Sequence, residues 1–141
     1  MPLIKIDVQD HFTPEQQAQL GDAIHVAIVR VLGIPERDKF QIITTHPSGQ
    51  IVAQDAGLGF ERTNNVLMIQ IFTQRGRSEA VKQHLFREIQ SELATVGIAP
   101  EDVFIGYFEN GPSDWSFGFG RAQYLTGELA VPGKQAISQP A

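Results

Sequence analysis

The sequence contains two related stretches, Gly33-Ile-Pro-Glu-Arg-Asp-Lys-Phe40 and Gly97-Ile-Ala-Pro-Glu-Asp-Val-Phe104, which share Gly, Ile, Asp and Phe at places 64 residues apart. The same offset lays the apolar stretch 3–8 over the apolar stretch 67–72. Organisation that repeats at a fixed spacing indicates a repeated structural unit. The chain is therefore expected to consist of two similar halves.

The first half reads as a strand, a helix and a second strand. Strands are predicted at 3–8 and 40–45. The helix between them is predicted to begin at Thr13-Pro14-Glu15-Gln16, which has the form of a capping box with proline at the first helical position. Gly33 is placed to end this helix. Its apolar face recurs at helical spacing through Leu20, Ile24, Ala27, Ile28 and Val31.

The second half repeats this order of elements. Strands are predicted at 66–73 and 103–108, with a helix between them that Ser78 caps and Gly97 ends. The apolar face of this helix consists of Val81, Leu85, Ile89, Leu93 and Val96.

Three further segments lie outside the repeat. Residues 46–65, rich in Pro, Gly, Asp and Asn, join the halves and are expected to include a short strand at Ile51–Ala53. Residues 111–129 lack a helical period and hold the only tryptophan, which is typical of a subunit contact or of an apolar pocket wall. Residues 130–141 resemble a loose tail.

Together these elements predict an α+β fold in one domain, built as a tandem β-α-β repeat with halves at about 2–46 and 66–110. Right-handed crossovers would give a four-stranded mixed sheet with both helices on one face. The stretch 66–72 is apolar at nearly every residue, as in a strand buried on both faces. We therefore expect the open face of the sheet to pack on other subunits of a homo-oligomer.

Composition excludes several classes of function. The 141 residues are 42% hydrophobic and contain no apolar run long enough to span a membrane. The chain has no cysteine, which excludes disulfides and thiolate sites. A net charge of -5 without a Lys/Arg cluster argues against a nucleic-acid partner. The first residues do not form a signal peptide, so a cytoplasmic protein is expected.

Standard catalytic and cofactor motifs are nearly absent. The pairs Gly57-Leu-Gly59 and Gly118-Phe-Gly120 lack the rest of a dinucleotide fingerprint. The four histidines, at positions 11, 25, 46 and 84, lack the spacing of metal ligands. What remains is Pro2, because a penultimate proline permits removal of the initiator methionine and would expose a secondary amine. With Met1 in place, Pro2 is an amide and cannot act as acid, base or nucleophile.

The predicted topology brings charged residues to Pro2. If the halves are related by a pseudo-two-fold axis, Pro2 lies beside the end of the third strand, where Arg75 and Arg77 follow. Asp38, just before the second strand, reaches the same edge of the sheet. The two arginines precede a helix N-terminus, which itself favours anions. The predicted site suits a small carboxylate.

Four segments closely resemble the malonate semialdehyde decarboxylases of the tautomerase superfamily. They are the opening Pro2-Leu-Ile-Lys-Ile-Asp7, Arg37-Asp-Lys-Phe-Gln-Ile42, the loop Asp55-Ala-Gly-Leu-Gly-Phe-Glu-Arg-Thr63, and above all Asp114-Trp-Ser-Phe-Gly-Phe-Gly-Arg-Ala-Gln-Tyr-Leu-Thr-Gly-Glu-Leu129. The resemblance covers nearly the whole chain, from Pro2 to about Leu129.

This resemblance implies a homotrimer, no metal or organic cofactor, and decarboxylation of malonate semialdehyde to acetaldehyde. It implies that Pro2 is the catalytic amine and Asp38 its polar partner. Arg75 and Arg77 would bind the substrate carboxylate. The same comparison implies a hydrophobic wall made of Trp115, Phe117, Tyr124 and Leu129, in which Tyr124 stands where a phenylalanine is common.

The protonation state of Pro2 decides between reaction classes. The two arginines lower the pKa of a nearby amine and Asp38 raises it. A neutral proline would be a base for keto–enol tautomerisation, whereas a cationic one would be an acid for decarboxylation or hydration. The alternative to the decarboxylase is therefore a tautomerase of 2-keto acids, or a hydratase or dehalogenase of small unsaturated acids, on the same fold. A third alternative is a non-catalytic oligomeric binding module that retains Met1. No nucleic acid or membrane is expected as a partner.

Overall fold

The computed structural model describes residues 1–131, and most of the predicted tail, 132–141, lies outside the described residues. Strand β1 (Pro2–Gln9), helix α1 (Pro14–Leu32) and strand β2 (Phe40–His46) form the first half. Strand β3 (Leu67–Gln74), helix α2 (Glu79–Ala94) and strand β4 (Val103–Asn110) form the second half. The predicted strand–helix–strand repeat is confirmed, with strand ends shifted by one or two residues.

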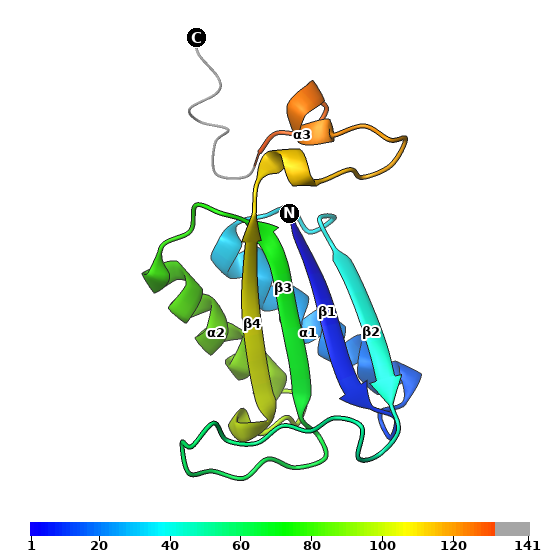
Figure 1. Ribbon diagram of the computed structural model, residues 1–141, viewed down its shortest axis with the longest axis vertical. Coiled ribbons are helices and arrows are strands. Elements are labelled where there is room, and N and C mark those ends of the chain that lie inside the picture. The colour runs from blue at the N-terminus through cyan, green and yellow to red at the C-terminus, as the bar shows by residue number, and fades with distance from the viewer. Residues whose placement is uncertain (132–141) are drawn as a thin grey trace.

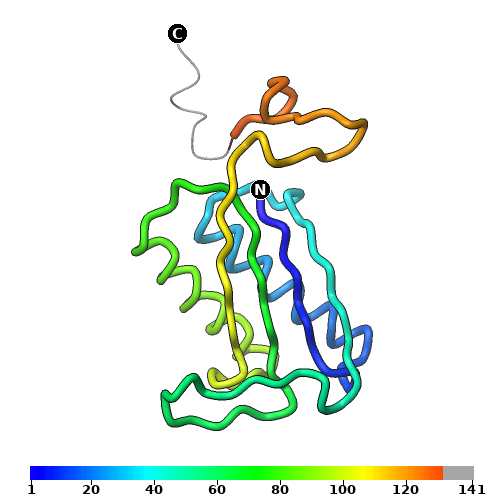
Figure 2. Tube along the Cα trace, in the orientation of Figure 1, coloured from blue at the N-terminus to red at the C-terminus, as the bar shows by residue number. Residues whose placement is uncertain are grey.

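The four strands form a single mixed sheet in the order β2-β1-β3-β4. Strand β1 pairs parallel with β2, β3 pairs parallel with β4, and the central pair β1–β3 is antiparallel. Both helices cover the same face of the sheet (Figure 1), and the tube view in Figure 2 shows the opposite face uncovered within one chain. This is the predicted fold class.

Helix α1 begins and ends where its sequence signals predict. The Thr13 hydroxyl accepts from the Gln16 N–H, and the Gln16 side chain accepts from the Thr13 N–H, which completes the capping box. At the other end Gly33 adopts a left-handed conformation with φ 66° and donates its N–H to the Val29 carbonyl. A glycine adopts this backbone conformation without a steric penalty.

Helix α2 ends earlier than predicted. Ser78 caps its start as expected, but the helix stops at Ala94 rather than continuing to Gly97. The Ile98 N–H reaches back to the Leu93 carbonyl and closes the turn, while Gly97 takes the positive φ of 91°. Val96, predicted on the apolar face, therefore lies beyond the helix and is 36% exposed.

The core lies between the sheet and the two helices. Alternate residues of β1 and β3, including Ile6 and Ile69, are fully buried against α1 and α2. Alternation with period two sends their neighbours to the other face. That face remains apolar and partly exposed in one chain, through Phe40, Ile42, Phe104 and Phe108.

The expected strand at Ile51–Ala53 is not formed, since these residues carry no strand pairing. Side chains hold the connection between β2 and β3 instead. The Arg62 guanidinium donates to the carbonyls of Gln54 and Glu101. Asp102, 1% exposed, accepts from the Thr63 N–H and hydroxyl. The Gln54 carbonyl and the Thr63 N–H are therefore hydrogen-bonded without a strand partner.

The segment after β4 folds back over the edge of the sheet at which the N-terminus lies (Figure 1). We call residues 111–129 the C-terminal extension. It contains a single 3-10 turn at Pro112–Asp114 and, contrary to the expectation of no helix, one α-helical turn, α3 (Gln123–Thr126). Within residues 1–131, no helix is both long and apolar enough to cross a membrane.

Candidate active site

The amino end of β1 lies beside the carboxyl end of β3, because these strands are antiparallel and Pro2 pairs with Thr73. Both residues are buried. The parallel strand β2 begins at the same edge, two residues after Asp38. The sheet topology therefore brings the chain's first residues close to residues from both halves of the repeat.

Met1 and Asp38 form an ion pair at this edge. The Met1 nitrogen lies 3.6 Å from Oδ2 of Asp38, and the two side chains are only 2% and 15% exposed. The backbone N–H of Asp38 donates to the Pro35 carbonyl at 3.0 Å, which fixes the turn that carries the carboxylate. Burial lowers the pKa of the Met1 ammonium, and Asp38 opposes this by favouring the charged form.

Arg77 and Thr73 complete the polar edge. The Thr73 hydroxyl is buried and donates to the Met1 carbonyl at 2.9 Å. The Arg77 guanidinium donates to Thr73 Oγ1 at 2.9 Å and to the Gln74 carbonyl at 3.1 Å. Its positive charge also contributes to the lowered pKa of the Met1 ammonium. Arg77 is thus electrostatically coupled to the N-terminal amine.

Arg75 points to a different part of the same edge. Its backbone N–H donates to the Asn110 carbonyl at 2.7 Å, and its exposed side chain lies over Gly111. A Cβ atom added at Gly111 would come within 2.8 Å of an Arg75 guanidinium nitrogen. The two arginines therefore occupy distinct positions, with Arg77 beside the amine and Arg75 beside the start of the C-terminal extension.

A cavity of about 800 Å³ opens next to Asp38. One side of the cavity is formed by the turn between α1 and β2, and the other side is formed by the C-terminal extension. Phe117 contacts Phe40 at 5.8 Å and Tyr124 at 5.3 Å between ring centroids. The lining residues are Gly33, Ile34, Pro35, Arg37, Asp38, Phe40, Phe117, Tyr124, Leu129 and Ala130.

This combination of fold and edge geometry agrees with the family comparison. Two family profiles, each described as "Tautomerase enzyme", match residues 38–118 and residues 2–61. The chain belongs to the tautomerase family. The probable tautomerase YrdN of Bacillus subtilis (strain 168) is 36% identical over 130 residues, covering 92% of this chain and 100% of that protein.

Two solved structures of malonate semialdehyde decarboxylases are similar to this chain in both sequence and fold. FG41 malonate semialdehyde decarboxylase inhibited by 3-bromopropiolate is 53% identical with a TM-score of 0.90, covering 92% of this chain and 99% of that chain. A malonate semialdehyde decarboxylase studied for its decarboxylase and hydratase activities is 38% identical with a TM-score of 0.86, covering 90% and 98%. The resemblance drawn from the sequence is confirmed, and the protein is an enzyme of the tautomerase superfamily.

Three of the four residues expected to form a hydrophobic wall line the cavity, and the fourth does not. Phe117, Tyr124 and Leu129 line the cavity, whereas Trp115 does not. Trp115 stacks on Phe117 at 6.4 Å, and its indole N–H donates to Asn110 at 2.7 Å. Trp115 therefore supports the wall from behind through its stacking on Phe117, and Asn110 provides the hydrogen-bond partner of its indole N–H.

Sequence reasoning missed Phe40 as a cavity residue. The sequence pattern predicts only that Phe40 begins a strand, but its ring packs against Phe117 and lines the cavity. The available signal was its position two residues after Asp38, at the same edge of the sheet.

The Tyr124 hydroxyl lies in the electrostatic field of the polar edge. Burial raises the pKa of Tyr124, the negative charge of Asp38 raises it further, and Arg77 opposes both effects. The hydroxyl therefore stays protonated at neutral pH and is available as a hydrogen-bond donor next to the carboxylate of Asp38.

The histidines lie away from this edge or bind protein groups. His46 contacts Asp7 at 2.7 Å, His11 contacts Asn65 at 2.7 Å, and His25 contacts the Glu36 carbonyl at 2.8 Å. In the part of the chain that the structure describes, no group of three or more His, Cys, Asp or Glu side chains is arranged to hold a metal ion.

Proposed function

We propose that the protein decarboxylates malonate semialdehyde (3-oxopropanoate) to acetaldehyde and carbon dioxide without a cofactor, once Met1 has been removed. The observation that carries the proposal is the meeting of Asp38, Arg77 and the start of β1 beside an aromatic cavity. The 53% and 38% identical malonate semialdehyde decarboxylases support this substrate over others.

Removal of Met1 converts the Pro2 amide into a secondary amine. The Met1 side chain is 2% exposed, so its departure leaves space for a small molecule next to Asp38. The Met1 carbonyl, which is bonded to the Pro2 nitrogen, accepts from Thr73. The freed Pro2 amine would therefore lie beside Thr73, within the field of Asp38 and Arg77.

Decarboxylation requires that negative charge be stabilised on the substrate carbonyl oxygen. The bond between the carboxylate carbon and the adjacent carbon breaks, and its electron pair moves towards the carbonyl to give an enolate. A protonated Pro2 amine stabilises this charge by hydrogen bonding to the carbonyl oxygen. Alternatively, the neutral amine adds to the substrate aldehyde with loss of water, the resulting iminium accepts the electron pair to become an enamine, and water releases the product from Pro2 once carbon is protonated. A proton then returns to carbon and gives acetaldehyde.

The arginines and the aromatic wall have complementary parts in this proposal. Arg75 and Arg77 bind the carboxylate through charge-assisted hydrogen bonds and hold it out of the carbonyl plane. The apolar side chains Phe117, Tyr124 and Leu129 disfavour the charged carboxylate relative to neutral carbon dioxide. Asp38 favours the cationic form of Pro2 by its negative charge.

A tautomerase or hydratase activity on the same site is the second candidate. The observations that favour it are the name of the 36% identical relative, a probable tautomerase, and the hydratase activity named for the 38% identical decarboxylase. Both activities would use the same amine and carboxylate-binding groups. They differ from the first candidate in whether the substrate loses carbon dioxide.

We also propose a homotrimer as the assembly. The open face of the sheet carries four large apolar side chains that are each at least 40% exposed in one chain, namely Phe40, Ile42, Phe104 and Phe108. Several large apolar side chains exposed on one face favour a protein–protein interface there. The trimer is the assembly that the family resemblance implies for such a sheet.

Product identification separates the two candidate activities. Processed protein is incubated separately with malonate semialdehyde and with phenylpyruvate, and the products are followed by ¹H NMR. Acetaldehyde from the first substrate supports the decarboxylase. Enol–keto conversion of phenylpyruvate without any acetaldehyde from malonate semialdehyde would favour the tautomerase instead.

A further inference from the structure

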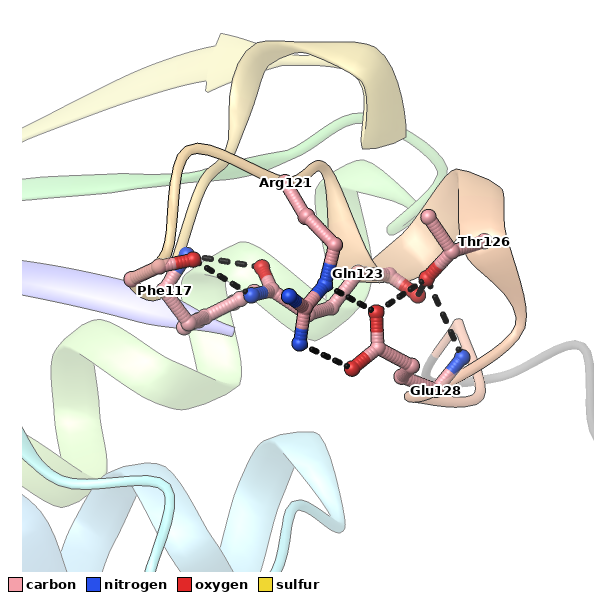
Figure 3. A network of polar contacts seen from close by, with 6 residues as sticks. Phe117, Arg121, Gln123, Thr126 and Glu128 are labelled. Atoms are coloured by element: carbon pink, nitrogen blue, oxygen red, sulfur yellow. Dashed lines mark hydrogen bonds and ion pairs between the residues drawn. The ribbon is translucent and has the colours of Figure 1, made fainter.

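The Gln123 side chain has an unusual position inside the C-terminal extension. It is only 7% exposed, although glutamine is ordinarily a surface residue. Its Oε1 accepts from the Phe117 N–H at 2.8 Å, and its Nε2 donates to the Gly118 carbonyl at 2.8 Å. Figure 3 shows the Gln123 amide hydrogen-bonded to the backbone at Phe117 and the next residue. Both ends of one side chain thus bind consecutive residues of the opposite backbone.

The backbone that Gln123 binds leads into a strained turn. Gly118, Phe119 and Gly120 have φ values of 136°, 61° and 69°, so three successive residues adopt conformations that L side chains rarely take. Phe119 is not a glycine, and its left-handed conformation needs support from the surrounding structure. The Gln123 amide provides such support immediately before the turn.

Gln123 also fixes the other residues of the cavity wall. Its backbone carbonyl accepts from the Leu129 N–H at 3.1 Å, and it directly precedes Tyr124 in α3. The ion pair of Arg121 with Glu128, with two contacts of 3.0 Å, closes the same loop on its outer side (Figure 3). One residue therefore links Phe117, Tyr124 and Leu129, the three members of the wall.

We propose that Gln123 is a positioning residue that holds this apolar wall in place at the cavity beside Asp38. The inference rests on the proposed function for its catalytic consequence, but its structural part stands independently of the substrate. Neither the carboxylate of Asp38 nor the guanidinium of Arg77 belongs to the extension. Loss of the amide should therefore displace Phe117, the wall residue that the Gln123 side chain binds, while Asp38 and Arg77 stay in position.

The test replaces the amide with an apolar side chain of similar length, Gln123→Met. Both hydrogen bonds are lost, so the kcat for malonate semialdehyde should fall roughly tenfold or more, as misplacement of groups by about 1 Å does in other sites. The KM should change by less than about threefold, because the carboxylate ligands are untouched. Gln83→Met, at an exposed position of α2, is the matched control and should behave as wild type.

A spectroscopic readout separates this proposal from the proposed function. Trp115 is the only tryptophan and stacks on Phe117, so its emission reports directly on the wall. Gln123→Met should shift that emission. The Phe117 N–H, which its bond to Gln123 should make slow to exchange in the wild type, should exchange in the variant at the rate of an open loop. If wild type yields no acetaldehyde, the proposed function fails while these two readouts still test the positioning.

Any of three results would overturn the proposal. Wild-type emission and kcat in Gln123→Met would show that the amide does not hold the wall, and shifted emission with unchanged kcat would show that the wall's position does not matter for turnover. Should Gln123→Met not fold, hydrogen exchange on the unaltered protein decides alone. Rapid exchange of the Phe117 N–H would then contradict the bond to Gln123.

Discussion

Asp38 is the residue on which the proposed chemistry depends most, because it alone favours the cationic form of the amine. Burial and Arg77 both lower the pKa of the N-terminal ammonium, and Asp38 raises it. The Asp38→Asn variant keeps the side-chain shape and removes the charge. It should lower the pKa of Pro2 and shift activity from decarboxylation towards tautomerisation. A ¹⁵N NMR titration of the Pro2 nitrogen measures this, and an unchanged pKa would contradict the assigned role.

Arg77 and Arg75 provide a second test at the residue scale. Each charge-assisted contact with a carboxylate contributes roughly 1.5–3 kcal/mol, which is about ten- to hundredfold in kcat/KM. Arg77→Ala and Arg75→Ala should each reduce kcat/KM for a 3-oxo acid by this amount. Only Arg77→Ala should also raise the pKa of Pro2, because Arg77 is the arginine coupled to the N-terminal amine.

The melting temperature of each arginine variant, measured by circular dichroism, is the control for folding. If both single variants and the double variant keep wild-type kcat/KM, the two guanidinium groups are solvated loop charges and bind no substrate. The pKa comparison would then still show whether Arg77 acts on the amine.

The two tyrosines give a test of burial that does not depend on substrate. Burial raises the pKa of both Tyr107 and Tyr124 above the ordinary value of about 10. Absorbance at 295 nm should therefore show well under half of the tyrosinate signal at pH 10 in the folded protein, and the full signal after unfolding in alkali. Half-ionisation of both tyrosines at pH 10 would contradict the buried positions.

The same shift predicts how stability depends on pH. The unfolded chain releases its tyrosine protons near pH 10, whereas the folded chain retains them to higher pH. The contribution to the free energy of unfolding is therefore fully present below about pH 10 and falls as the pH rises further. Denaturant titrations at pH 8 and at pH 11 measure this loss.

At the scale of elements, Gly111 joins β4 to the C-terminal extension and gives Arg75 its place. Its backbone is extended, with φ -123° and ψ 171°, so alanine adopts it without strain. The added Cβ would instead meet an Arg75 guanidinium nitrogen at 2.8 Å. Gly111→Ala should raise the KM of a carboxylate substrate and leave the stability within about 0.5–1 kcal/mol of wild type.

Steady-state kinetics and thermal unfolding measure the two parts of that prediction. Gly127→Ala is not a matched control, because Gly127 has a positive φ of 84°. An exposed alanine substitution with ordinary backbone, such as Ser113→Ala in the neighbouring turn, serves better. Unchanged KM in Gly111→Ala would show that the position of Arg75 has no bearing on binding.

Local signals made some elements predictable and left others undetermined. Thr13 and Gln16 cap the start of α1, and Gly33 caps its end. Each acts within one turn of the helix, so both ends of α1 are predictable from the sequence. The end of α2 depends on the turn that the Ile98 N–H closes on Leu93, and the glycine at 97 marks that turn rather than the last helical residue. Ile51–Ala53 has a composition typical of a strand but pairs with no neighbouring strand.

The part of the candidate site that is predictable from the sequence is the part that the order of the strands determines. The pseudo-repeat places Pro2, Asp38 and the arginines at one edge once the strand order is known. The different positions of Arg77 and Arg75 depend on their side-chain contacts with Thr73 and Gly111. Sequence patterns carry no information about these contacts. The roles of Phe40 and Gln123 are not predictable from the sequence, because they arise from contacts that Phe40 and Gln123 make with Phe117 and Gly118 in the folded chain.

At the scale of the whole molecule, the uncovered sheet face predicts assembly. The protein should sediment as a trimer at micromolar concentration, because the exposed apolar side chains of β2 and β4 need a partner surface. Charged substitutions at two of them, Ile42→Lys and Phe104→Lys, should shift the sedimentation coefficient towards that of a monomer. A stable wild-type monomer at micromolar concentration would contradict the proposed assembly.

The most direct test of the central claim compares the protein with and without Met1. A single preparation that retains Met1, verified by intact mass, is divided, and one half is treated with methionine aminopeptidase until the mass falls by one methionine. Both halves receive malonate semialdehyde, and acetaldehyde is quantified by ¹H NMR. The account predicts acetaldehyde from the processed half and none above background from the other. Equal activity in the two halves, or no acetaldehyde from the processed protein, would contradict catalysis by the Pro2 amine.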